Sequence, residues 1–201
     1  MSDPNPETSR GFVGRNGMRL LMATCVATLI IGAAVPAARR GEIMEQADAT
    51  IDLIETVERG AQRHRADTGA LAIEIAAPDA NSAYVGATFH RLGMRQSYPG
   101  WNGPYLPHPL TMAHNPFGGS IALRSRPEDV TPMGFALEGA GPFGQYLVLD
   151  EIPRNVARLV ELRFDGEATD ADGLRNWSGS GRVRWNESDS RLLVILDVDL
   201  P

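Results

Sequence analysis

An uncharged, apolar run over residues 20–38 limits what this chain can fold into more than any other feature. At about 1.5 Å of helix per residue, about 19 residues span roughly 28 Å, close to the thickness of the hydrocarbon core of a bilayer. Lipid offers no water to backbone polar groups, so the run is expected to be helical, with a kink at Pro36. The sequence therefore predicts one transmembrane segment, followed by a single globular domain.

The helical pattern continues beyond this run, with charged residues between apolar ones. Steps of three and four residues separate Ile43, Ala47, Ile51, Ile54 and Val57. This spacing is typical of an amphipathic helix that buries one stripe. We expect one helix over residues 18–69, apolar all round in its first half and amphipathic in its second, ending at Gly69.

The residues before this helix form a short polar segment, 1–17, in which prolines and glycines disfavour a stable helix. Arginines flank the apolar run on both sides, so the positive-inside count is nearly balanced. The short leader and the large folded part favour an N-terminus in the cytoplasm and a C-terminal domain across the membrane. A cleaved secretory signal is the alternative, but the run is long for a signal core.

Composition excludes some classes of function. The formal net charge is -6, and all 19 basic residues are Arg. An acidic chain without a basic stripe is not expected to bind nucleic acid. The single cysteine, Cys25, lies within the apolar run, so no intrachain disulfide is expected.

Three parts of the chain are similar to those of a known family. The first combines the leader ending in Gly17, the following Met18 and the long helix. The second, in the C-terminal half, contains Trp101, Gly103, Pro104, Tyr105 and Leu106, followed by Asn115, Pro116, Phe117, Gly118 and Gly119. Together they resemble the type IV pilin and type II secretion pseudopilin family. A later stretch, residues 152–185, resembles the family's short helix, Asp-Gly turn and strand.

The resemblance implies a fold, a processing step and partners. The fold is α+β, with the long helix packed on a C-terminal antiparallel sheet over residues 70–201. A prepilin peptidase would cut between Gly17 and Met18 and methylate the new N-terminus. Before assembly, the chain would reside in the inner membrane as a single-pass protein with its domain in the periplasm. It would then assemble with other pilin or pseudopilin subunits into a filament.

One position departs from the family pattern. Five residues into the mature chain the family usually has a Glu, thought to pair with a neighbour's N-terminal amine, and here Met22 takes its place. A thioether cannot form that ion pair. This favours a minor or tip subunit over a major one. Small residues such as Gly32 would let the assembly helices approach closely.

The soluble domain can be divided from its sequence. Residues 76–119 are rich in Pro, Gly and Asn and predict a long connecting loop with one short helix. Strands are expected at 120–124, 134–138, 145–149, 181–185 and 192–198, and a helix at 153–163. In the fourth strand Val183 and Trp185 alternate with Arg182 and Arg184, which predicts a half-buried strand.

Several residues are candidates for metal binding or packing. Asp165, Asp170 and Asp172 lie in a glycine-containing run that could supply oxygen ligands to calcium, although the spacing does not match an EF-hand. His108 and His114 form a close pair in a Pro-rich loop, with a spacing that does not favour metal binding. His64 and His90 are expected at the surface or its boundary. Trp101, Tyr105 and Phe117 are expected to anchor the loop by packing.

These observations lead to one interpretation and two rivals. The chain is expected to be a structural subunit, minor or tip, of a type IV pilus or secretion pseudopilus, and not an enzyme or a cofactor protein. Its rivals are a signal-anchored periplasmic binding or sensor domain that does not assemble, and a tethered hydrolase whose catalytic residues are distant in sequence. No nucleophile arrangement or phosphate-binding loop supports the hydrolase.

Overall fold

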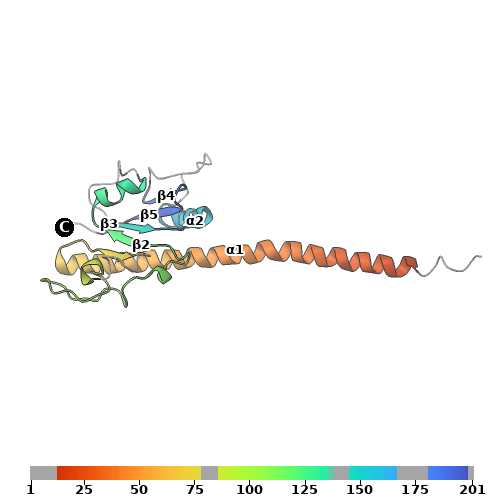
Figure 1. Ribbon diagram of the computed structural model, residues 1–201, viewed down its shortest axis with the longest axis horizontal. Helices are drawn as coiled ribbons and strands as arrows, with labels where there is room; N and C mark the ends of the chain where they lie inside the picture. Colours follow the sequence, from red (N-terminus) through yellow and green to blue (C-terminus); the bar gives the residue numbers. More distant parts are fainter. Residues whose placement is uncertain (1–12, 78–85, 136, 138–144, 167–180, 199–201) are drawn as a thin grey trace, which may run out of the picture. The chain divides into compact units, whose positions relative to one another are not determined.

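The computed structural model describes residues 13–77, 86–135, 137, 145–166 and 181–198, with side chains from residue 39 onward (Figure 1). The chain divides into two compact units, Met1–Ile43 and Met44–Pro201. The second unit is α+β and contains a five-stranded antiparallel sheet, which confirms the predicted fold class at this level.

Helix α1 spans Val13–Thr68. It starts five positions before the predicted start at residue 18, and it ends where predicted, because Gly69 adopts a φ of 70° that side chains disfavour. Within the described residues, no helical stretch is both long and apolar enough to cross a membrane. The predicted segment 20–38 belongs to α1, and its side chains lie outside the described residues.

The amphipathic half of α1 buries one stripe in the second unit. Ala47, Ile54, Val57 and Ala61 are all buried, at the spacing that the sequence predicts. Polar contacts join the neighbouring flank to the ends of strands in the sheet. Glu58 pairs with Arg182 and accepts a hydrogen bond from the Asp197 backbone N–H at 2.6 Å.

The sheet has the strand order β1-β2-β3-β5-β4, and every neighbouring pair is antiparallel. Its strands are β1 Glu74–Ala76, β2 Ile121–Arg124, β3 Gln145–Leu149, β4 Val183–Asn186 and β5 Arg191–Leu196. Four of the five predicted strands are thus present, β3 with the predicted bounds and the other three with shifted ends. Strand β1 was missed, because three residues are too short to show a period of two.

The sheet is covered on both faces (Figure 1). Helix α1 runs along one face. On the other face, Tyr146 and Val148 of β3 pack in a cluster with Val130 and Phe135, from the segment after β2. All five residues of β3 are consequently buried, as expected for the central strand of a three-layer arrangement.

That covering segment corrects one prediction. Residues 134–138 were expected to form a strand, but the chain makes two short 3₁₀ helices, η4 Pro127–Asp129 and η5 Thr131–Met133. Neither Phe135 nor residue 137 is in a strand, and residues 136 and 138 lie outside the described part. The segment lies over the sheet and does not extend it.

The same cover explains Arg184. The sequence predicted a half-buried β4 with its arginines exposed, yet Arg184 is buried with Val183 and Trp185. Its Nε donates to the Gly181 carbonyl at 3.1 Å, and burial lowers the pKa of its guanidinium. Alternation along a strand indicates which residues share a face, but not whether a face is covered.

Helix α2 spans Arg154–Phe164, one residue later than predicted, with Pro153 at its N-cap. Val156, Ala157 and Val160 are buried. Its C-terminal end lies beside α1, because Arg163 forms an ion pair with Glu55 at 2.8 Å. Helix α2 therefore occupies one flank of α1.

Candidate functional site

The connecting loop, whose described part is residues 86–119, is the most elaborate feature of the second unit. It contains two 3₁₀ turns, η2 Ala87–Phe89 and η3 Met112–His114. The sequence predicted a loop with one short helix here. A loop this long in a compact domain is usually functional.

A buried carboxylate holds the loop against β1. The side chain of Glu74 is fully buried, and its Oε1 lies 2.9 Å from Nδ1 of His90 and accepts from the Leu110 N–H at 3.0 Å. Its Oε2 accepts from the backbone N–H groups of Leu92 at 3.0 Å and Gly93 at 3.3 Å. A buried charge is tolerated only when it is hydrogen-bonded in this way. Glu74 thus joins two distant parts of the loop to the edge of the sheet.

An aromatic cluster holds the loop against the end of α1. The Tyr105 hydroxyl donates to Asp67 Oδ2 at 2.9 Å and accepts from the Asn102 N–H at 2.9 Å. Its ring contacts Trp101 edge-to-face, with centroids 5.7 Å apart, and His64, with centroids 5.3 Å apart. Trp101 and Tyr105 are therefore packing anchors, as predicted.

The third aromatic residue of that prediction, Phe117, is half-buried. Its backbone N–H donates to Asn115 Oδ1 at 3.0 Å, and Asn115 Nδ2 donates to the Asp150 carbonyl at 2.8 Å. The Asn-Pro-Phe phrase thus connects the end of the loop to the end of β3 through the asparagine, which the sequence analysis named as part of the phrase but not as an anchor.

His64 and His90 were expected at the surface or its boundary, and this was wrong. Both are buried. His64 Nδ1 lies 3.0 Å from the Ala70 carbonyl, and Nε2 lies against the Tyr98 hydroxyl. Burial lowers the pKa of His64, and nearby Arg91 lowers it further. Its position, three residues after Ala61, continues the apolar stripe of α1 and was the signal that could have revealed its burial.

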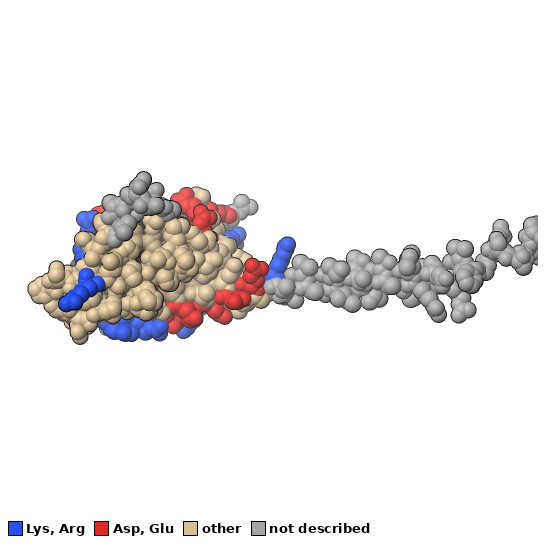
Figure 2. Space-filling view, turned by 60° about the horizontal axis from the view of Figure 1, so that its bottom comes forward, with Lys and Arg blue, Asp and Glu red and all other residues tan. Residues whose placement is uncertain are grey.

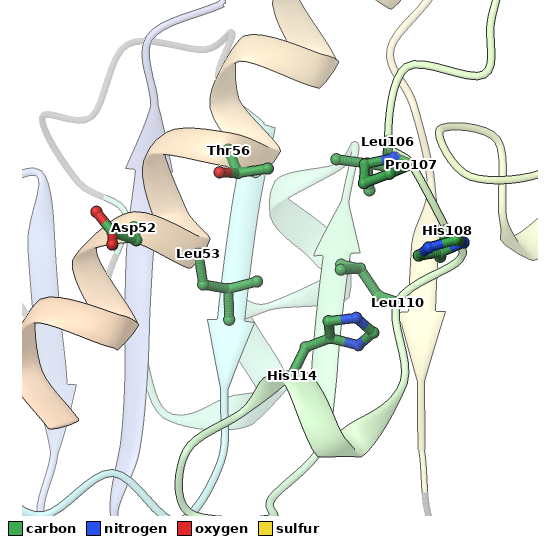
Figure 3. Close-up of a pocket in the computed structure, with 8 residues that line it drawn as sticks. All are labelled: Asp52, Leu53, Thr56, Leu106, Pro107, His108, Leu110 and His114. Atoms are coloured by element: carbon green, nitrogen blue, oxygen red, sulfur yellow. The ribbon is translucent and has the colours of Figure 1, made fainter.

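A groove lies between α1 and the loop (Figure 3). Its volume is about 240 Å³. One wall comes from Asp52, Leu53 and Thr56 of α1, and the other from Leu106, Pro107, His108, Leu110 and His114 of the loop. Pockets for drug-sized ligands are about 300–1,000 Å³, so this groove is better matched to a side chain.

The structure brings His108 and His114 to this one groove, although five residues separate them. Thr111 holds the His114 ring from one side, because its N–H and Oγ1 lie 3.0 and 2.9 Å from Nδ1. No group of three His, Cys, Asp or Glu side chains with the geometry of a metal site occurs among the described residues.

The predicted calcium ligands are placed only in part. Asp165 follows α2 and accepts two backbone N–H groups, from Arg182 to Oδ1 at 3.1 Å and from Val183 to Oδ2 at 2.8 Å. Its carboxylate thus connects the end of α2 to the start of β4. Asp170 and Asp172 lie outside the described residues.

The predicted processing and assembly residues are all in α1. Gly17, Met18, Met22, Gly32 and Pro36 fall within its helical backbone, and their side chains lie outside the described residues. The helix extends through the predicted Gly17–Met18 junction.

Comparison of the chain with protein-family models, with curated proteins and with solved structures gives no match. The function is therefore inferred from the residues and the geometry of this chain.

Proposed function

We propose that this chain is a structural subunit of a type IV pilus or a type II secretion pseudopilus, in a minor or tip position. The observation that carries the proposal is helix α1, Val13–Thr68, which includes the apolar run and ends in a stripe buried in an α+β domain. A helix of this length exceeds what a 158-residue domain needs for its core (Met44–Pro201). The additional turns require a separate role, and a role in assembly uses them.

In this proposal the apolar run has two successive environments. It first spans the inner membrane, where a helix satisfies its own backbone groups. A prepilin peptidase then removes residues 1–17, and the run packs with the corresponding helices of neighbouring subunits. Small residues such as Gly32 allow close van der Waals contact between helices. Met22 offers no carboxylate to a neighbour's amine, which is why we assign a minor or tip position.

The domain contributes a rigid body with an ordered loop. Glu74 holds the connecting loop to the sheet by buried hydrogen bonds, and the Tyr105 cluster holds it to α1 by a partly buried one. A loop held at both ends presents a constant surface to neighbouring subunits, which an assembly of repeated contacts needs. The groove is a part of that surface.

Processing by the peptidase tests the proposal. The full chain is produced together with an active prepilin peptidase, and separately with an inactivated one, and its mass is measured. We expect loss of residues 1–17 and a methylated Met18 only with the active enzyme. Gly17→Leu should block the cut, whereas the matched variant Gly14→Leu should leave it in place. A chain that keeps its leader in all cases contradicts the proposal.

The rival interpretation, a signal-anchored binding domain, predicts the opposite result. Its N-terminus would stay intact with the active peptidase, and the purified chain would bind a small molecule. The groove is the candidate site for such a ligand, but its volume of about 240 Å³ is below the usual range. An intact leader, together with a small molecule bound in the groove against Leu53 and Leu110, would favour this rival.

A further inference from the structure

The groove beside α1 has apolar walls and an acidic edge. Leu53, Leu106 and Leu110 form much of its lining, and Asp52 lies at its edge on α1 (Figure 3). Asp48 and Glu45 are exposed one and two turns earlier on the same face of the helix. Figure 2 shows acidic side chains gathered along the first described turns of α1, with basic ones further along the same edge of the molecule. A complementary partner would insert an apolar side chain and place a positive charge beside it.

One exposed stripe of the chain, formed by Arg158 and Leu162 of α2, has this combination of an apolar side chain and a positive charge. Among the described residues, only Met44 and Leu162 are large hydrophobic side chains with high exposure, at 50% and 43%. Leu162 lies on α2, one turn after Arg158, so both project from the outward face of that helix. Arg158 is exposed, and within the described part of the chain neither Arg158 nor Asp52 has an ion-pair partner.

The groove and this stripe lie on opposite flanks of α1. At 100° per residue, Asp52 and Thr56 project to one side of the exposed face of the helix, and Glu55 and Glu58 to the other. The first pair borders the groove, whereas Glu55 pairs with Arg163 of α2. Leu162 therefore cannot enter the groove of its own chain. Two complementary surfaces on opposite sides of one molecule produce a head-to-tail contact, which continues from copy to copy.

We infer that Leu162 of one copy of this chain occupies the groove of the next copy, with Arg158 facing Asp52. The inference rests on the proposed function and deepens it, because it identifies the neighbour as a second copy. Of the two positions proposed above, it favours a minor subunit that repeats along a filament over a single subunit at the tip. The apolar insertion supplies the contact, and the charge pair selects its register.

Disulfide cross-linking in the full chain tests this contact. In a Cys25→Ser background, Thr56→Cys and Leu162→Cys are introduced on separate chains, which are produced together in membranes and mildly oxidised. We expect dimers only when both variants are present, and a ladder of higher species when one chain carries both cysteines. The matched control replaces Leu162→Cys by Glu187→Cys, in an exposed turn, and should give no ladder. Dimers from Leu162→Cys alone, or no cross-link at all, would overturn the inference.

Charge reversal tests the pairing of Arg158 with Asp52. Both are exposed, so Arg158→Asp and Asp52→Arg should leave the fold intact. Each alone should lower the cross-linked fraction about fivefold, because like charges then face each other. The two together should restore it. A double variant that stays at the level of the single ones overturns the pairing.

Leader removal, measured on the same samples, separates this inference from the proposed function. If the chain is cut at Gly17–Met18 but forms no ladder, the contact between copies is refuted and the role as a subunit is retained. If an uncut chain forms the ladder, the contact between copies is retained and the role as a processed subunit is refuted.

Discussion

The imidazole of His90 lies 2.9 Å from the buried carboxylate of Glu74, and the two backbones also form an isolated antiparallel bridge. Sixteen positions separate these residues in the chain. The same carboxylate accepts the N–H groups of Leu92, Gly93 and Leu110. One glutamate therefore determines where the connecting loop lies, and with it one wall of the groove.

Glu74→Gln should destabilise the domain. The amide keeps the shape of the side chain, but it replaces one acceptor with a donor and leaves buried N–H groups without a partner. We expect a loss of roughly 2–4 kcal/mol in the free energy of unfolding, measured by denaturant titration of the full chain. The control Glu128→Gln, at an exposed position, should change it by less than about 0.5 kcal/mol. Equal effects of the two would contradict the role given to Glu74.

The burial of His64 predicts a dependence of stability on pH. Burial lowers the pKa of His64 in the folded chain below the ordinary value of about 6.5, so the unfolded chain binds a proton at a higher pH than the folded one. The part of the free energy of unfolding that comes from keeping His64 neutral is fully present above about pH 6.5. It is lost as the pH falls through the lowered pKa of the folded chain. Denaturant titration at pH 7.5 and at pH 5.5 measures the difference.

His64→Gln should reduce that difference, since an amide does not titrate in this range. The matched control is His108→Gln, because His108 is exposed in the groove. A pH dependence that is unchanged in His64→Gln would show that other groups cause it. Asp67 and Arg91, whose charges act on His64 in opposite directions, would be the first to test.

The hydrogen bond from Tyr105 to Asp67 joins the loop to the last turn of α1. Tyr105→Phe keeps the ring contacts with Trp101 and His64 and removes only the hydroxyl, so we expect a loss of about 1–2 kcal/mol in the free energy of unfolding. In a double-mutant cycle with Asp67→Ala, the two losses should not add, because both remove the same bond. Additive losses would mean that the bond contributes nothing.

Close packing at Gly93 gives a further prediction. A Cβ at this position would lie 2.4 Å from the Pro109 Cα, a backbone atom that cannot move alone. Gly93→Ala should therefore cost roughly 2–3 kcal/mol, measured by thermal or denaturant unfolding. Gly86→Ala, where no atom of the described residues lies within 4 Å of the added atom, is the control and should be nearly neutral. A neutral Gly93→Ala would mean that the two parts of the loop are less closely packed.

The spacing of apolar residues and the positions of turn residues predicted those helices and strands that show such a pattern in their own sequence. The stripe through Ile54 and Val57, the stop at Gly69, helix α2 and four strands could all be read from spacing and from turn residues. Periodicity works in these cases because each element presents one apolar face to a core. The leader junction and the membrane segment remain predictions, since they concern side chains outside the described residues.

Contacts between distant residues could not be read in this way. Strand β1 is only three residues long and is defined by its pairing with β2. Glu74 resembles any acidic residue until the backbone donors of Leu92 and Leu110 are placed around it. The groove likewise needs α1 and the loop to meet, so the sequence could not show that His108 and His114 line the same groove as Asp52.

By itself, the sequence determined that the chain has a long helix, apolar and then amphipathic, and an α+β domain after it, because hydrophobic periodicity is a property of neighbouring residues. Only the tertiary structure decided that His64, His90 and Arg184 are buried, that Glu74 holds the loop, and that a groove forms beside Asp52. Burial depends on what covers a residue, and the covering segments come from parts of the chain that no local pattern connects.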